Sequence, residues 1–176
     1  MKRASSYFWE IIRFAAVTLL IVVPIRAYVA QPFIVSGVSM VPSFENGEYL
    51  IIDELSYLLR APKRGEVIVF RYPRDLSKFF IKRVIGLPGE TITIQDGKVH
   101  IKNGQTELIW DYPDIPTDPS GGSGIYSLGP KQYFVLGDNR NMSLDSRAWG
   151  SVDANLIKGR VFVRLYPFNR ISFLPT

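Results

Sequence analysis

The feature that most constrains the fold is an apolar segment near the N-terminus, at residues 11–30. Its length is close to the roughly 20 residues that an α-helix needs to cross a bilayer, and only Arg13 and Arg26 add charge to it. Its uncharged centre, residues 14–25, would be about 18 Å long as a helix, shorter than the ~30 Å hydrocarbon core. The two arginine side chains would therefore have to extend to the headgroup region. We expect a single spanning helix here.

Two alternatives remain for this segment. A cleavable secretory signal also begins with basic residues, here Lys2 and Arg3, followed by an apolar stretch. A cut after Ala30, however, would place the large Tyr28 where a small side chain is needed. An amphipathic core helix is less consistent with a centre in which Thr18 is the one polar side chain.

Charges on either side of the segment predict its orientation. Two basic residues precede it, whereas residues 27–59 carry four acidic residues and no lysine or arginine. By the positive-inside rule, the N-terminus then lies in the cytoplasm. We predict two parts: a cytoplasmic N-terminus with a membrane anchor at residues 1–30, and an extracytoplasmic domain at residues 31–176. The expected location is the plasma membrane, crossed once.

From residue 31 onward, short runs rich in β-branched and aromatic residues alternate with glycine, proline, asparagine and aspartate. This spacing predicts a mainly β fold, a barrel or a sandwich, and not repeated β-α-β units. One short helix is expected at residues 53–59, and a long surface loop rich in proline and glycine at residues 111–131. The predicted strands are residues 48–53, 67–72, 79–85, 91–95, 99–101, 133–136 and 160–166.

The composition excludes several classes of function. The chain has no cysteine, which removes cysteine nucleophiles, disulfides and cysteine metal sites. Its one histidine, His100, lies in a short hairpin strand with no nucleophile motif nearby. Most of the net charge of +5 belongs to residues 1–30, so it favours a membrane surface over a nucleic acid. An enzyme of this sequence that cleaves peptide bonds would need a base other than histidine.

The first segment with candidate chemistry is the turn-forming stretch 36–43, which contains Gly37, Ser39 and Pro42. Glycine gives the backbone room to present amide groups to a developing oxyanion, and proline stiffens the exit from the turn. Serine and glycine are also common turn residues, so this stretch by itself is more typical of an ordinary loop.

The second segment is the strand-like run 79–90. Alternation places Phe80, Lys82 and Val84 on one face, so Lys82 lies between large apolar neighbours. Burial disfavours an ammonium ion and lowers the pKa of a lysine, as a general base near neutral pH requires. Arg83 cannot serve, because a guanidinium group does not lose its proton in proteins. The alternative is that Lys82 is an edge-strand charge that discourages aggregation.

The third segment, residues 137–150, is a run of hydrogen-bonding side chains. Asp145 and Arg147 could pair with each other, and Ser143 could exchange a hydrogen bond with a lysine amine. A plain solvated loop explains the polarity of this run but not why Trp149 stands near its end.

Together these segments resemble the type I signal peptidase family, the serine proteases of peptidase family S26. Four motifs carry the resemblance and occur in the family's order: Ser39-Met40-x-Pro42, residues 64–70, residues 82–90 and residues 137–152. With the N-terminal segment they cover nearly the whole chain. The resemblance implies a Ser/Lys dyad in a β-rich catalytic domain that rests on the membrane. It also implies removal of secretory signal peptides after small residues in an Ala-x-Ala pattern.

The resemblance further implies a role for each matching residue. Ser39 is the nucleophile, Lys82 is the general base, and Ser143 orients the lysine amine. Asp145 and Arg147 form a supporting pair. No metal or organic cofactor is implied.

The oxyanion hole and the substrate pockets match the family less closely. The Ser39 amide supplies one oxyanion donor. Some members have a serine as second donor where this chain has Gly37, and Ser36 lies one residue away. Substrate pockets that exclude large side chains are expected to be lined by Ile34, Met40 and Phe80. The expected partners are secretory preproteins and the lipid bilayer, with no nucleic acid.

Two rival functions remain. A self-cleaving repressor-type protease could share a Ser/Lys dyad, but it would carry a DNA-binding region and an Ala-Gly or Cys-Gly cleavage site. This chain contains neither dipeptide. A non-catalytic, membrane-tethered β-module that binds exported peptides would keep its function when Ser39 is replaced by alanine.

Overall fold

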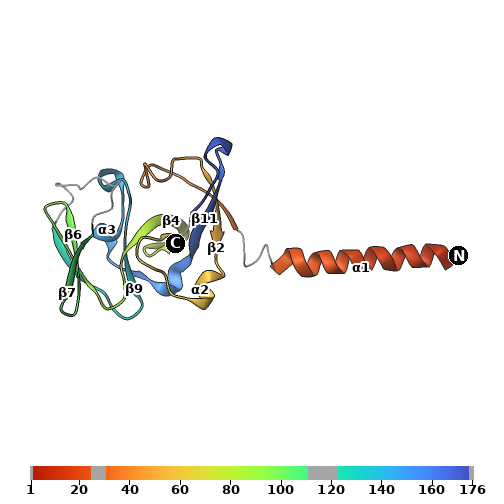
Figure 1. The fold of residues 1–176 in the computed structure, drawn as a ribbon, viewed down its shortest axis with the longest axis horizontal. Helices are drawn as coiled ribbons and strands as arrows, with labels where there is room; N and C mark the ends of the chain where they lie inside the picture. Colours follow the sequence, from red (N-terminus) through yellow and green to blue (C-terminus); the bar gives the residue numbers. More distant parts are fainter. Residues whose placement is uncertain (1, 25–30, 111–122, 175–176) are drawn as a thin grey trace.

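The computed structural model describes residues 2–24, 31–110 and 123–174. One long helix, α1 (Lys2–Pro24), extends away from a body made mostly of strands, and the N-terminus lies at the end far from them (Figure 1). The mainly β class predicted for the chain beyond residue 31 is confirmed.

Helix α1 forms over most of the segment that the sequence predicts to span a membrane. Many of its apolar side chains are exposed, among them Phe14, Leu19 and Leu20. No helix among the described residues combines the length and the hydropathy that crossing a membrane requires. Residues 25–30, which complete the predicted segment, lie outside the described residues.

The larger of two sheets has eight strands, and its neighbouring strands pair in antiparallel fashion. The order is β1-β2-β11-β3-β4-β9-β10, with β12 paired to β11. The bounds are β1 (Gln31–Ile34), β2 (Tyr49–Asp53), β3 (Val67–Tyr72), β4 (Asp75–Gly86), β9 (Gln132–Leu136), β10 (Val152–Asp153), β11 (Ile157–Tyr166) and β12 (Ser172–Phe173).

The smaller sheet has four antiparallel strands in the order β7-β6-β5-β8. Within the described residues, neither sheet closes into a barrel. The bounds are β5 (Thr91–Gln95), β6 (Lys98–Asn103), β7 (Thr106–Trp110) and β8 (Gly124–Ser127). Short helices α2 (Ser56–Leu59) and α3 (Ser146–Trp149) and the 3-10 turns η2 (Arg140–Met142), η3 (Ala154–Leu156) and η4 (Phe168–Arg170) connect the strands.

Each of the predicted strands coincides with a strand of the structure, and the predicted helix at residues 53–59 contains α2. The strands that sequence reasoning missed are short: β1, β7, β8 and β10 stand at the ends of the two sheets, and β12 has two residues. A strand paired on one side buries fewer side chains, so its apolar alternation is weak. The β5–β6 turn does carry its signal, because Asp96 and Gly97 both have positive φ, as a tight hairpin turn requires.

Three clusters of buried apolar side chains form the core, and β4 contributes to all of them. Ile85 belongs to the cluster that joins β4 and β9 to β5 and β6 of the smaller sheet. Val84 belongs to a cluster on one face of the larger sheet, and Ile81 packs against a cluster on the other. Strand β4 therefore packs against apolar clusters on several sides, and this packing restricts the positions of the side chains that it carries.

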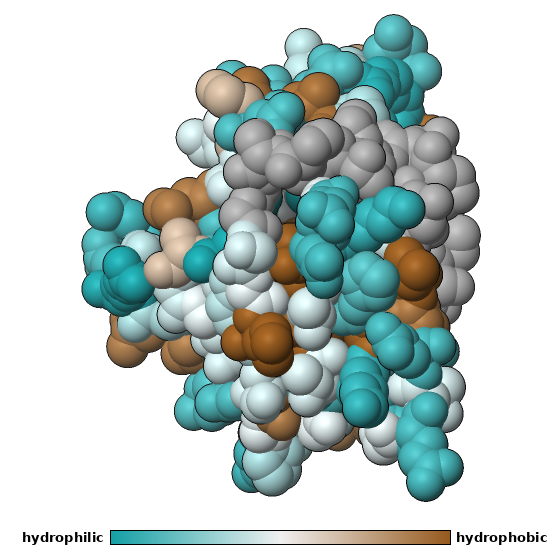
Figure 2. Space-filling view, turned by 90° about the vertical axis from the view of Figure 1, so that its left-hand side faces the viewer, coloured by the Kyte–Doolittle hydropathy of each residue, from teal (hydrophilic) through white to brown (hydrophobic). Residues whose placement is uncertain are grey.

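The smaller sheet turns a mostly polar surface to solvent. Seen from the end of the molecule that carries this sheet, hydrophilic side chains predominate and the apolar ones form small separate groups (Figure 2). Its apolar residues point inward instead: Ile92, Ile94, Val99 and Ile101 are all buried. The smaller sheet thus covers one part of the larger sheet.

A glycine in β11 tests how closely the central strands approach each other. A Cβ atom at Gly159 would lie 2.6 Å from the carbonyl oxygen of Asp53, which is backbone and cannot rotate away. We expect Gly159→Ala to lower the free energy of unfolding by about 1–3 kcal/mol, the range for overpacked cores. Denaturant unfolding followed by circular dichroism would measure it. Gly129→Ala is the matched control, because its Cβ would meet the movable end of the Gln132 side chain at 3.2 Å. Equal effects of the two changes would contradict this account.

Candidate active site

The loop between β1 and β2 presents Ser39 at the surface of the larger sheet. Both ends of the loop are joined by a hydrogen bond from the Val35 amide to the Glu48 carbonyl oxygen, at 2.9 Å. Met40 and Phe44 are each 1% exposed and anchor the loop in the core. Ser39 itself is half-buried. The apolar neighbours of Ser39 in the sequence therefore hold a polar side chain where solvent and substrate can reach it.

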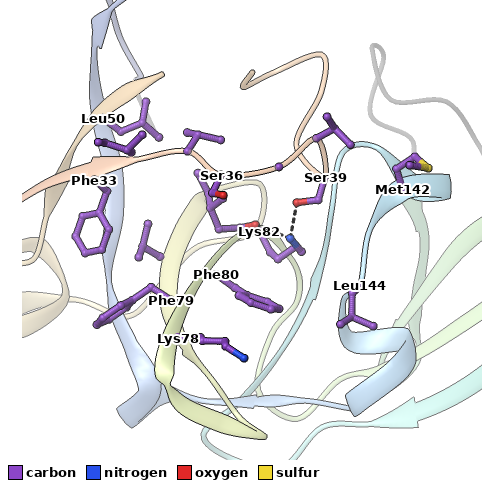
Figure 3. Close-up of a pocket in the computed structure, with 16 residues that line it drawn as sticks. Phe33, Ser36, Ser39, Leu50, Lys78, Phe79, Phe80, Lys82, Met142 and Leu144 are labelled. Carbon is purple, nitrogen blue, oxygen red and sulfur yellow. Dashed lines mark hydrogen bonds between the residues drawn. The ribbon is translucent and has the colours of Figure 1, made fainter. Parts of the chain in front are cut away.

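Strand β4 brings Lys82 to this serine from 43 positions further along the chain. The Lys82 Nζ atom donates a hydrogen bond to Ser39 Oγ at 2.7 Å and another to the Ile81 carbonyl oxygen at 2.9 Å. Figure 3 shows the two side chains pointing toward each other across the cleft. The two residues singled out in separate sequence segments thus lie in direct contact.

The environment of Lys82 is unusually dry for a lysine. Its side chain is almost completely buried, with 4% exposed, and the ring of Phe80 has its centroid 5.5 Å from Nζ. Burial lowers the pKa of Lys82 to about 8, because the charged form loses hydration, and the carboxylates of Asp145 and Asp138 oppose this shift only in part. A substantial fraction of neutral amine is therefore present near neutral pH.

A cleft of about 460 Å³ opens beside the Ser39–Lys82 contact. Four successive residues of β4, from Lys78 to Ile81, line it, and β4 pairs with β9 only from Arg83 onward. The remaining lining residues are Phe33, Ile34, Val35, Ser36, Gly37, Val38, Ser39, Leu50, Val69, Lys82, Met142 and Leu144. The cleft is thus mainly apolar, and the half-buried serine and the buried lysine are among the residues that line it.

The predicted pocket residues divide into two groups. Ile34 and Phe80 line the cleft as expected. Met40 does not, because its side chain turns into the core beneath the loop, against the cluster that contains Phe44 and Leu50. The assignment of Met40 to a substrate pocket is therefore wrong for this structure, and this residue, next to Ser39, packs in the core instead.

The predicted lysine-orienting residue, Ser143, makes no hydrogen bond to Lys82. Its Oγ atom is buried and has no hydrogen-bond partner among the described residues. It lies against Gly137, where a Cβ atom would come within 2.1 Å of Ser143 Oγ and 2.5 Å of the Ser39 carbonyl oxygen. The absence of a side chain at Gly137 is what lets Ser143 and the Ser39 backbone approach each other.

The predicted pair of Asp145 and Arg147 forms as expected. Arg147 donates from Nε and Nη2 to the two carboxylate oxygens of Asp145, at 2.8 and 3.0 Å. Asp145 also accepts from the Gly137 amide at 3.0 Å and caps the N-terminus of α3. This carboxylate therefore ties α3 to the end of β9.

A second ion pair was missed by sequence reasoning. Arg83, which follows Lys82, donates from Nε and Nη2 to the carboxylate of Asp138 at 2.9 and 2.6 Å. Both side chains are buried, at 6% and 1% exposed. The opposite charges of the two segments were the available signal, but 55 residues separate them in the chain, and no local pattern pairs them.

The candidate oxyanion donors differ in availability. The Gly37 amide donates to Asn46 Oδ1 at 2.9 Å, so it is already engaged and the assignment of this residue is corrected. Gly37 has φ of 94°, a region that glycine adopts without strain, and this conformation shapes the loop before Ser39. Ser36 is exposed and lines the cleft. No described residue accepts a hydrogen bond from the Ser39 amide.

Breaking the Arg83–Asp138 pair tests whether this buried ion pair stabilises the structure around the site. Replacing Asp138 by alanine would leave a buried guanidinium group without its carboxylate, and we expect the free energy of unfolding to fall by about 3–5 kcal/mol. Denaturant titration would measure it. Asp75→Ala is the matched control, because it removes the carboxylate of an exposed pair with Lys78 and should change stability far less. A similar small effect at both positions would show that the buried pair is not a structural support.

The chain is similar to proteins of one family. Residues 8–166 match the family described as signal peptidase, peptidase S26. A signal peptidase I from Leptolyngbya laminosa is 38% identical over 185 residues, which cover 98% of this chain and 86% of that protein. A probable signal peptidase I-2 from Synechocystis sp. is 39% identical over 162 residues, covering 89% of this chain and 72% of that protein. A crystal structure of a signal peptidase I from Enterococcus faecalis is 30% identical, with a TM-score of 0.48, over 58% of this chain and 97% of that chain.

Proposed function

The chain belongs to the signal peptidase family, peptidase S26, and we propose that it removes N-terminal signal peptides from exported preproteins with Ser39 as nucleophile and Lys82 as general base. As a member of this family it is a serine endopeptidase. The relatives named above are signal peptidases by name, which supports preproteins as the substrates.

One observation carries the proposed dyad: the 2.7 Å contact between Lys82 Nζ and Ser39 Oγ in a cleft large enough for a peptide. A general base must lie within hydrogen-bond reach of the proton that it removes and must be partly deprotonated at the working pH. Lys82 meets the first condition by its position and the second through its lowered pKa. No cysteine exists in the chain, and the single histidine lies in the smaller sheet, opposite Ile109 of β7.

The proposed reaction follows from this contact. Neutral Lys82 takes the hydroxyl proton of Ser39, and Oγ attacks the carbonyl carbon of the scissile peptide bond. The ammonium of Lys82 then gives its proton to the leaving amine as the carbon–nitrogen bond breaks. Water, deprotonated by the same amine, attacks the acyl-enzyme, and the proton returns to Ser39 Oγ as the signal peptide leaves. Each step ends with the lysine ready for the next.

The proposed oxyanion hole consists of the Ser39 amide and the hydroxyl group of Ser36. No described residue accepts a hydrogen bond from the Ser39 amide, and Ser36 lines the cleft. Donors of this kind stabilise the negative charge that develops on the carbonyl oxygen. A rotation of the Ser36 side chain on substrate binding would complete the pair.

We propose supporting roles for three residues of the 137–150 segment. Asp145 and Arg147 hold this segment against the end of β9 through the contacts described above. Ser143 Oγ is buried beside the Ser39 backbone and has an unused hydrogen-bonding capacity. A small movement of the lysine amine during the reaction would bring Ser143 into use as its acceptor, in the orienting role that the family resemblance implies.

The cleft supports cleavage after small residues in an Ala-x-Ala pattern. Its walls are mainly apolar, and Ile34 and Phe80 are among the side chains that line it. The stretch of β4 from Lys78 to Ile81 lies in the cleft and is not paired with β9, so an extended substrate can bind along this strand. Alternate side chains of such a peptide would then face the same wall, as a preference at two positions separated by one residue requires.

We propose that residues 1–30 anchor the enzyme in the plasma membrane, with the N-terminus in the cytoplasm and residues 31–176 as the extracytoplasmic catalytic domain. The long helix with exposed apolar side chains, the basic residues before it and the acidic residues after it support this arrangement. An anchor would keep the enzyme close to signal peptides that are themselves in the bilayer, which raises their effective concentration.

Replacing the dyad residues tests the chemistry. Ser39→Ala, Lys82→Ala and Lys82→Arg should each lower cleavage of a labelled preprotein by about 100-fold or more, the usual contribution of a nucleophile or base. Lys82→Arg is the sharpest of the three, because arginine keeps the charge but cannot accept the proton. The assay uses the detergent-solubilised full chain, with circular dichroism to check folding.

Lys98→Arg makes the same exchange on an exposed position of β6 and should leave cleavage unchanged. Cleavage retained in Lys82→Arg would remove the lysine as base. Cleavage retained in Ser39→Ala would remove the serine as nucleophile, whereas a wild type that binds the preprotein without cutting it would favour the non-catalytic β-module.

The pH dependence of cleavage is the second test. The reactive form of Lys82 is the neutral amine, so kcat/KM should rise with pH through a midpoint near the pKa of about 8 and level off above it. One pH unit below that midpoint, about a tenth of the enzyme would be active. The measurement is the initial rate on a labelled preprotein between pH 6 and 10, and a rate that is independent of pH across this range would be inconsistent with a lysine base.

A further inference from the structure

The ring of Phe80 joins the cleft to a group of aromatic side chains. It lines the cleft, and the Lys82 Nζ atom lies over it at 5.5 Å from the ring centroid. Tyr72 stacks on it at 4.6 Å with the rings 10° from parallel, and Trp149 meets it edge-on at 5.7 Å. Trp149 also meets the Tyr72 ring edge-on at 5.1 Å. The three rings therefore form a continuous aromatic packing behind the base.

Trp149 touches neither the cleft nor the dyad. It is not among the residues that line the cleft, and it sits at the end of α3, after Asp145 and Arg147. Its Nε1 atom is buried and has no hydrogen-bond partner among the described residues, so packing alone holds the ring in place. The β3–β4 turn closes over this region, because Arg74 Nη2 donates to the Ala148 carbonyl oxygen at 2.9 Å.

We propose that Trp149 is a positioning residue for catalysis: by backing Phe80, it keeps that ring against Lys82, excludes water from the amine and directs it to Ser39. The proposal rests on the proposed Ser/Lys mechanism. Phe80 lines the cleft, so its support comes from the rings packed against it, among them Tyr72 and Trp149. This role would explain why Trp149 stands near the end of the 137–150 segment, which a plain solvated loop does not explain.

The charged groups around Lys82 fix the sign of the expected effect. Asp138 and Asp145 face it from the segment after β9 and raise its pKa, while burial lowers it and is the largest influence. Each of the two carboxylates is paired with an arginine. Within β4, Lys78 lies at the cleft and is paired with Asp75. If Phe80 loses its backing, water reaches the amine, burial weakens and the pKa of Lys82 rises.

The test is the pH profile of kcat/KM for Trp149→Leu, measured with the full chain in detergent on a labelled preprotein. We expect the midpoint to rise by about 0.5–1 pH unit, so that cleavage at pH 7 falls roughly three- to tenfold while the loss shrinks at high pH. Trp149→Phe keeps an aromatic ring and should restore most of the wild-type profile. A merely structural tryptophan would lower the rate equally at every pH.

A double variant asks whether Trp149 acts through Phe80. Phe80→Leu should itself shift the midpoint, and adding Trp149→Leu to it should shift it little further. Trp110→Leu is the matched control: Trp110 packs beside the cluster that joins the two sheets, away from the dyad, and its loss should leave the midpoint in place. Thermal unfolding of each variant reports on folding, and Tyr72→Leu, which removes the ring stacked on Phe80, replaces Trp149→Leu if the latter does not fold.

The outcomes separate this proposal from the mechanism on which it rests. Three results would each overturn the positioning role while leaving the dyad intact. The first is an unchanged midpoint in Trp149→Leu, and the second is a shift by Trp149→Leu that is as large in the Phe80→Leu background as it is alone. The third is the same shift in Trp110→Leu. If cleavage by the wild type does not depend on Ser39, the proposed function itself fails, and that result is read from Ser39→Ala without any of these variants.

Discussion

The site depends on the burial of one amine. Lys82 is almost fully covered and contacts a hydroxyl and a carbonyl oxygen, and no carboxylate of the described residues is among its hydrogen-bond partners. A buried lysine with a carboxylate partner would be held in its charged form, whereas desolvation without such a partner favours the neutral form. The rest of the structure can be understood as the means of keeping this side chain dry and in contact with Ser39.

The fold separates Lys82 from Arg83, the positively charged residue that follows it in the chain. Arg83 points to the opposite face of β4 and takes the carboxylate of Asp138, while Arg147 takes that of Asp145. Both carboxylates near the site are therefore neutralised by arginines, and their remaining influence on Lys82 is smaller than that of burial. The 137–150 segment thus supplies acidic groups that pair with arginines and not with Lys82.

Local pattern was sufficient for several features. Alternation in the run 79–90 places Lys82 between Phe80 and Val84, and the structure has the same arrangement because β4 pairs with β3 in continuous register from Phe79 to Arg83. The Asp145–Arg147 pair spans two residues and was predicted from proximity alone. Edge strands such as β1 and β7 were missed, since a strand with one exposed side has a weaker apolar signal.

The sequence by itself determined the chemical possibilities: the chain has no cysteine and one histidine in a hairpin, which leaves Lys82 as the candidate base, and alternation already implies its burial. Tertiary structure alone decided which groups meet. It paired Arg83 with Asp138 across 55 residues, turned Met40 into the core, engaged the Gly37 amide with Asn46 and left Ser143 without a partner. The reason is that strand periodicity sets only the side to which a residue points. Hydrogen bonding and desolvation depend on segments that come together from distant parts of the chain.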